Sequence, residues 1–211
     1  YFFYNLGLAL KAQKNFEEAF NFFQNALALK SAQPEKNKKL KSQPNNECRL
    51  TVEAYQHSIE SGQDPSYLGF HFHKEGQFGE AEYVYRQILK TSPKNDRAQN
   101  DLGNVLLEMG RLEEATACFR KAIEINSNMD QAPYNLANIL SELGQKDEAI
   151  KLYRRAIKIN PDFFEAYFNL GLVLEGLEKL DQAVECYRQA AKINPNYAKA
   201  HYQAAGIFQQ L

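Results

Sequence analysis

The sequence predicts an all-α protein, a right-handed α-solenoid of stacked helix-turn-helix repeats. A leucine followed by a small residue recurs every 34 residues, at Leu68-Gly69, Leu102-Gly103, Leu136-Ala137 and Leu170-Gly171. A small and an aromatic residue keep the same interval, at Ala81, Ala115, Ala149 and Ala183 and at Tyr85, Phe119, Tyr153 and Tyr187. A third position is held by Pro93, Ser127, Pro161 and Pro195. Self-similarity at a fixed period indicates one structural unit stacked many times.

Two helices and a turn account for the pattern inside each unit. Between residues 130 and 160, apolar residues fall at helical spacing in two segments that are separated by 144–146. Small side chains at Ala137 and Ala149 let the two helix backbones approach closely. Pro161 lacks the N–H that would prolong the second helix. One unit cannot bury its apolar face alone, so we expect a core that runs along the stack.

The period and the order of these landmarks resemble the tetratricopeptide repeat family, whose unit is a helix-turn-helix of the same length. The resemblance covers nearly the whole chain except about 34–46. Full units are expected at 1–33, 62–95, 96–129, 130–163 and 164–197, and the first helix of a further unit at 198–211.

The segment 34–61 departs from this regular array. Its first part, 34–46, has four lysines, two prolines and one large apolar residue, which predicts a solvated basic linker. A docking site for an acidic partner is the alternative interpretation of these lysines. Residues 47–61 return to helical spacing, so we interpret them as the second helix of a degenerate repeat.

Composition narrows the classes of partner. The 25 Lys and Arg against 26 Asp and Glu leave a net charge of −1, which argues against nucleic acid. No run approaches the roughly 18 apolar residues of a membrane span. Three cysteines without C-x-x-C spacing argue against a disulfide framework or a zinc site and favour a reducing compartment, so we expect a cytoplasmic location. The start at Tyr1, inside a helical pattern, suggests a fragment.

Function is expected on the concave face, because the first helices of successive repeats line an inner groove in such solenoids. The positions that face this groove in the tetratricopeptide family correspond here to candidate peptide-binding residues Asn5, Tyr67, Asn100, Asp101, Asn104, Tyr134, Asn135, Asn138, Phe168, Asn169 and Tyr202.

The asparagines in this set recur at equivalent positions. A carboxamide both donates and accepts, so a row of them can pair with the main chain of an extended peptide. The arrangement is similar to the asparagines in the tetratricopeptide arm of O-linked N-acetylglucosamine transferases. The competing interpretation is that Asn-Leu-Gly is simply a common helix sequence in this family.

Aromatic and acidic residues complete the predicted groove. Tyr134, Phe168 and Tyr202 lie one repeat apart, where packing in the core competes with exposure to a ligand. The other predicted inner residues are mostly acidic: Asp101, Glu108, Glu142, Glu165 and Glu175 outnumber Arg97 and Lys199. A neutral or basic peptide is therefore favoured. No lysine occupies the position that grips chaperone C-terminal carboxylates in related domains.

Catalysis has little support in the sequence. The four histidines lack the i, i+4 spacing of a helical zinc pair, and no nucleophile-elbow, phosphate-loop or metalloprotease motif occurs. Cys118 and Cys186 come one residue before the aromatic residue that recurs every 34 residues, where a small buried hydrophobic residue is expected. We therefore expect no enzyme activity, no metal and no cofactor.

The prediction is a protein-protein interaction scaffold that holds an extended peptide or a partner helix in its concave groove. An alternative is the substrate-recognition arm of a larger enzyme, such as a protein O-glycosyltransferase, whose catalytic domain lies outside this chain. End-to-end self-association of the truncated array is a further alternative.

Overall fold

The computed structural model describes residues 54–60, 62 and 64–208. Contacts divide the chain into two compact units, Tyr1–Glu53 and Ala54–Leu211, and every described residue belongs to the second. The expected unit at 1–33 with its Asn5, and the linker at 34–46, therefore lie outside the described residues.

Helices follow one another without an intervening strand through the described residues. Residues 54–60 are helical and precede the remaining helices. These are α4 (Pro65–Lys74), α5 (Phe78–Thr91), α6 (Asp96–Glu108), α7 (Leu112–Ile125), α8 (Gln131–Glu142), α9 (Lys146–Ile159), α10 (Phe164–Glu175), α11 (Leu180–Ile193) and α12 (Ala198–Phe208).

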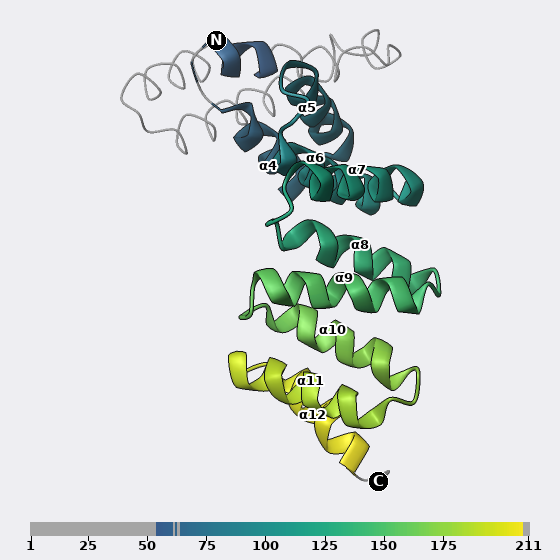
Figure 1. The fold of residues 1–211 in the computed structure, drawn as a ribbon. Coiled ribbons are helices and arrows are strands. Elements are labelled where there is room, and N and C mark those ends of the chain that lie inside the picture. Colours follow the sequence, from purple (N-terminus) through teal and green to yellow (C-terminus); the bar gives the residue numbers. More distant parts are fainter. Residues whose placement is uncertain (1–53, 61, 63, 209–211) are drawn as a thin grey trace, which may run out of the picture. The chain divides into compact units, whose positions relative to one another are not determined.

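Each helix packs against the next, and the first helices α4, α6, α8 and α10 also contact one another in succession. Figure 1 shows this stack running from α4 to α12. The prediction of an all-α solenoid is confirmed.

Three tight turns inside the pairs depend on glycine. Gly76, Gly110 and Gly144 adopt φ values of +72°, +73° and +76°, in the left-handed region that other residues avoid. The fourth pair places Glu178 in the same role at φ 59°. A residue with a Cβ is strained there, so this turn is less favourable than its three counterparts.

The core is a line of rings that lie against small residues. Tyr85, Phe119 and Tyr187 are fully buried. A Cβ added to the glycine opposite each ring, at Gly69, Gly103 and Gly171, would lie 2.8, 2.6 and 2.5 Å from its nearest atom. The Leu-Gly repeat therefore exists because the aromatic ring of the second helix occupies the space of a side chain on the first.

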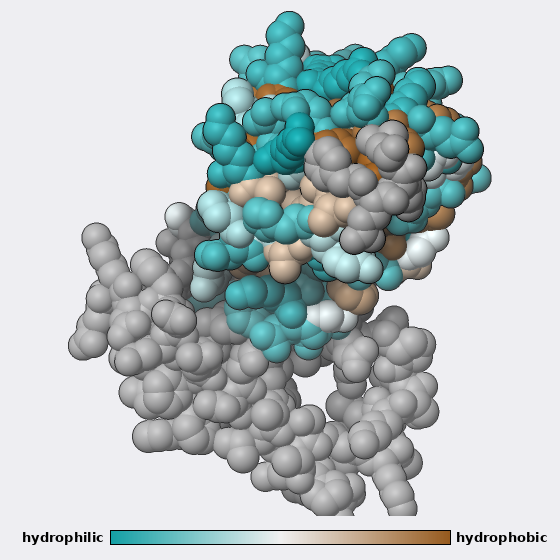
Figure 2. Space-filling view, turned by 90° about the horizontal axis from the view of Figure 1, so that it is seen from below, coloured by the Kyte–Doolittle hydropathy of each residue, from teal (hydrophilic) through white to brown (hydrophobic). Residues whose placement is uncertain are grey.

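The end of the described stack that carries α12 presents a mostly polar surface. Viewed from the end that carries α12, hydrophilic side chains cover most of the visible described surface, and hydrophobic ones appear in smaller patches between them (Figure 2). Among the described helices, none is long and apolar enough to cross a bilayer.

Candidate functional site

The first helices bring most of the predicted site residues to one side. Because side chains three and four residues apart share a helix face, Asn100 and Asn104 on α6 lie together, as do Asn135 and Asn138 on α8. Asn169 follows on α10. We call Asn100, Asn104, Asn135, Asn138 and Asn169 the asparagine row.

Hydrogen bonds join the asparagine row across repeats. The Nδ2 of Asn135 donates to Oδ1 of Asn104 at 2.9 Å and to Oδ1 of Asn100 at 3.3 Å. One repeat later, Nδ2 of Asn169 donates to Oδ1 of Asn138 at 2.9 Å and to the Tyr134 hydroxyl at 3.1 Å. The row is therefore built into the packing of successive first helices, a role that the sequence pattern did not indicate.

A buried tyrosine fixes one member of the row further. The hydroxyl of Tyr153, whose side chain is almost fully buried, donates to Oδ1 of Asn138 at 2.6 Å. Together with the bond from Asn169, this occupies both lone pairs of that carbonyl oxygen. Burial raises the pKa of the Tyr153 hydroxyl above its usual value, so it remains a donor at neutral pH.

Some polar atoms of the row make no side-chain hydrogen bond with any described residue. They include Nδ2 of Asn104 and the Oδ1 atoms of Asn135 and Asn169. The bonds between repeats orient these three amides, because the other polar atom of each amide is already hydrogen-bonded and fixes the amide plane. The row thus presents both oriented donors and oriented acceptors.

The carboxylate at the N-terminal side of the row is partly buried. Asp101 accepts from Nδ2 of Asn100 at 3.2 Å. Burial raises the pKa of the Asp101 carboxyl, while this hydrogen bond and the charge of Arg97 act in the opposite direction. The predicted inner residue Glu175 is also engaged, because its Oε2 accepts from the Tyr187 hydroxyl.

The predicted aromatic residues differ widely in exposure. Tyr134 is half-buried, with its ring centroid 4.6 Å from that of Phe163. Phe168 is only 8% exposed and packs against Tyr187 and Tyr197 at 5.5 and 5.1 Å. By contrast, Tyr202 is 78% exposed. Of the two interpretations of these aromatic residues, packing in the core applies to Phe168, because Tyr197, which precedes α12, covers its ring.

Two other predicted residues lie at opposite extremes. Asn100 is 6% exposed, and Tyr67 on α4 is 56% exposed. Asn100 therefore acts within the packing of α6 and α8 rather than at the surface.

A pocket of about 410 Å³ joins two of the predicted aromatic residues. It lies between α10 and α12 and is lined by Phe168, Ala198, Lys199, Tyr202 and Gln203. The pocket is open to solvent rather than enclosed. In the part of the chain that the structure describes, no group of three or more His, Cys, Asp or Glu is placed to hold a metal ion.

Comparisons with protein families agree on one repeat type. Models described as "Tetratricopeptide repeat" match residues 3–31, 72–126 and 164–197, and one described as "TPR repeat" matches 137–178. No curated protein matches the chain.

Solved structures of similar fold include the crystal structure of MamA, at 26% identity and a TM-score of 0.62, covering 67% of this chain and 83% of that one. Another is YrrB, described as "a TPR protein with an unusual peptide-binding site", at 21% identity and a TM-score of 0.59, covering 95% and 89%. A third is the first TPR of Spaghetti (RPAP3) bound to the HSP90 peptide SRMEEVD, at 23% identity and a TM-score of 0.53, covering 55% and 91%.

Proposed function

Because this chain belongs to the tetratricopeptide repeat family, we propose that it is an interaction scaffold whose asparagine row binds the main chain of an extended peptide. The observation that carries the proposal is the set of amide atoms that the inter-repeat bonds orient and leave without a described partner: Nδ2 of Asn104 and Oδ1 of Asn135 and Asn169. A peptide backbone offers one acceptor and one donor per residue, which complements such a row whatever the peptide's side chains are.

Preorganisation supports this use. Each of these amides is already fixed by the bond that it makes across repeats, so binding would cost little side-chain entropy. The printed descriptions of YrrB and the Spaghetti domain name peptides as their ligands, which supports a peptide as the ligand class here.

Charge favours a neutral or basic peptide. Asp101 and Glu165 lie among the predicted inner residues, and position 5 of the units holds Asn100, Tyr134 and Phe168 rather than lysine. An acidic chaperone tail such as SRMEEVD would therefore find no lysine clamp along the described repeats.

The cleanest variant removes a free donor and keeps the inter-repeat bonds. Asn104→Asp still offers Oδ1 to Asn135 but replaces the free NH₂ with a second oxygen. We expect uncharged peptides, selected on the wild-type chain from a random library, to lose at least about fivefold in affinity, the free energy of one hydrogen bond. Fluorescence anisotropy measures the change.

The matched control is Asn128→Asp, which adds the same charge on an exposed loop. Alanine at Asn138 would be a poorer test, since it also removes the partner of the Tyr153 hydroxyl. Equal affinities for wild type, Asn104→Asp and Asn128→Asp would contradict the proposal.

A second candidate function is the substrate-recognition arm of a larger enzyme, such as a protein O-glycosyltransferase. The asparagine row favours it, because an arm that binds main-chain atoms accepts many substrate sequences. An α/β catalytic region encoded after Leu211 would support it, and further repeats followed by a stop codon would contradict it. Self-association through the ends of the array stays a prediction, which analytical ultracentrifugation over a range of concentrations tests.

A further inference from the structure

A second pocket lies on the opposite side of α6 from the asparagine row. It has a volume of about 390 Å³ and is formed by α5, α6 and α7. Gln99 and Leu102 are its residues from α6. At about 100° per residue, these two positions point away from Asn100 and Asn104. The pocket therefore opens beside the second helices and is separate from the proposed peptide site.

Small side chains create the space. The apolar wall consists of Leu89, Leu102, Ala117 and Cys118. One repeat later, the positions of Ala117 and Cys118 hold Lys151 and Leu152, and two repeats later the position of Gln99 holds Tyr167. These larger residues would fill the same volume, so this repeat differs from its successors.

Three cations surround this apolar wall. Arg86, Lys90 and Lys121 are exposed and line the pocket, and none of its lining residues is acidic. Arg86 is bound by Glu82 and Glu114. Lys90 and Lys121 form no ion pair with a described residue; Glu124, one turn beyond Lys121, is exposed. The pocket is thus apolar at its wall and positively charged at its opening.

Gln99 adds an uncharged polar group to the lining of the pocket. Its side chain is 5% exposed and lines the pocket, and it makes no hydrogen bond with another side chain or with the backbone of the described residues. Its amide atoms are not among the fully buried, unpartnered polar atoms of the described residues, so they remain accessible from the pocket. A polar group of a ligand can therefore form a hydrogen bond with this carboxamide.

We propose that this pocket binds an acidic peptide segment of a partner protein, with one large apolar side chain inserted against Leu102 and Ala117. The neighbouring peptide amides of that segment reach Gln99, and its carboxylates face Lys90 and Lys121. An apolar anchor enclosed by complementary charge is the usual composition of an interface centre. The occupant differs in charge from the neutral or basic peptide proposed for the asparagine row.

The pocket can be tested with substitutions that introduce the residues found at equivalent positions of other repeats. The double variant Ala117→Lys, Cys118→Leu fills the pocket with the residues found one repeat later, at 151 and 152. The double variant Lys90→Glu, Lys121→Gln removes its positive charge with the residues found at the equivalent positions 124 and 189. Both variants use residues that the fold already accommodates at these positions. Circular dichroism with thermal unfolding confirms that each is folded.

Peptides are selected from a random library on the Asn104→Asp chain, so that binding at the asparagine row is reduced. We expect an acidic consensus with one large apolar residue, and at least about a tenfold loss of affinity in each pocket variant. Selected peptides without acidic residues, peptides that bind both pocket variants as tightly as the parent, or no selected peptide at all would overturn the proposal. The test of the proposed function is independent of this one, because Asn104→Asp changes the asparagine row and not the pocket.

Cysteine labelling tests the charge of the pocket directly. Cys118 lines it, and Cys186 holds the same position two repeats later, where Glu185 replaces Ala117. Each thiolate attacks a methanethiosulfonate reagent, forms a mixed disulfide and releases methanesulfinate. The rate ratio of the anionic sulfonatoethyl reagent to the cationic trimethylammonium-ethyl reagent should be at least about threefold higher at Cys118. Equal ratios at the two cysteines would overturn the positive character of the site.

Discussion

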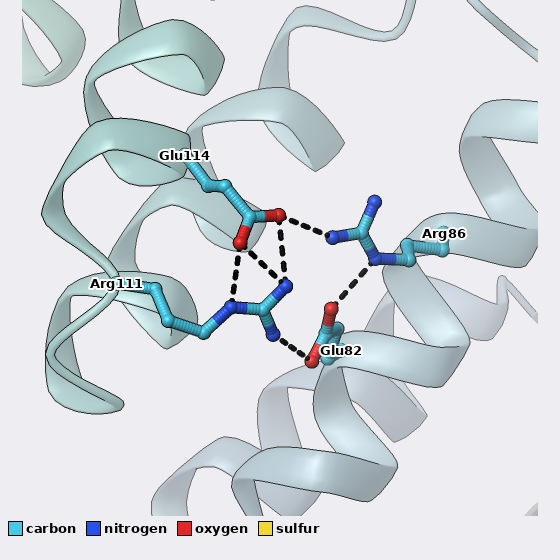
Figure 3. Close-up of polar contacts among 4 residues, drawn as sticks. All are labelled: Glu82, Arg86, Arg111 and Glu114. Atoms are coloured by element: carbon cyan, nitrogen blue, oxygen red, sulfur yellow. Dashed lines mark hydrogen bonds and ion pairs between the residues drawn. The ribbon is translucent and has the colours of Figure 1, made fainter.

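Arg111 joins two neighbouring repeats through Glu82. Its Nη1 donates to Oε2 of Glu82 at 2.7 Å, although 29 residues separate them along the chain. The same guanidinium donates through Nε to Oε1 of Glu114 at 2.7 Å, and Arg86 binds both carboxylates (Figure 3). This closed network of two arginines and two glutamates joins α5 to the start of α7.

Glu114→Gln should weaken this network in a pH-dependent way. The hydrogen bond from Arg111 is the main cause that holds the pKa of Glu114 below its usual value. Its contribution to stability is therefore present above the unfolded pKa, about 4.3, and is lost as the pH falls through the lower folded pKa.

Urea unfolding of wild type and Glu114→Gln measures this contribution. The difference in midpoint should be present at about pH 7 and should shrink toward about pH 3. Because the groups are exposed, added salt should also reduce it at pH 7. A difference that stays constant with pH would contradict the assignment.

Two tyrosines at equivalent positions should respond differently to the loss of their hydroxyls. Tyr153→Phe removes a bond to Asn138 and should reduce the free energy of unfolding by about 1 kcal/mol. Tyr85 is fully buried, and its hydroxyl has no hydrogen-bond partner among the described residues, so Tyr85→Phe should be neutral or stabilising. Phe119 shows that this position accepts a plain ring. Thermal and urea unfolding compare the two; equal losses would refute the distinction.

Alanine should have opposite effects at two helical glycines. In Gly103→Ala the new Cβ would lie 2.6 Å from the Phe119 ring, so we expect a loss of about 1–3 kcal/mol from overpacking. In Gly79→Ala the Cβ meets no atom within 4 Å, and the better helix propensity should stabilise the protein by about 0.5–1 kcal/mol. Urea unfolding gives both values, and a Gly103→Ala variant at least as stable as wild type would be inconsistent with the close approach of ring and helix.

Glycine should stabilise the turn between α10 and α11, the one among the four described helix pairs that lacks it. Glu178 holds φ at 59° where the three preceding pairs have glycine. Glu178→Gly should therefore stabilise the protein by about 1 kcal/mol, and the reverse change Gly144→Glu should destabilise it by about the same amount. The shift in melting temperature of the two variants tests this; shifts of the same sign would contradict the role assigned to the turn.

Much of the fold follows from local patterns. The 34-residue period, the spacing of apolar residues and the turn glycines predicted the helix pairs, because helix formation depends on neighbouring residues. The same spacing placed Asn135 and Asn138 on one face of their helix. It could not predict that Asn100 and Phe168 are buried. Asn100 contacts Asn135 of the next repeat, and Phe168 packs against Tyr197, which precedes α12.

The sequence by itself determined the class of fold, the repeat length and the residues that form the first helices. Only the tertiary structure decided which side chains meet across repeats: the bonds of Asn135 to Asn104, the salt bridge of Arg111 to Glu82, and the pocket beside Ala117. The reason is physical. These contacts join residues about one repeat apart, so they depend on the angle and depth at which neighbouring helix pairs dock, and no local spacing specifies either quantity.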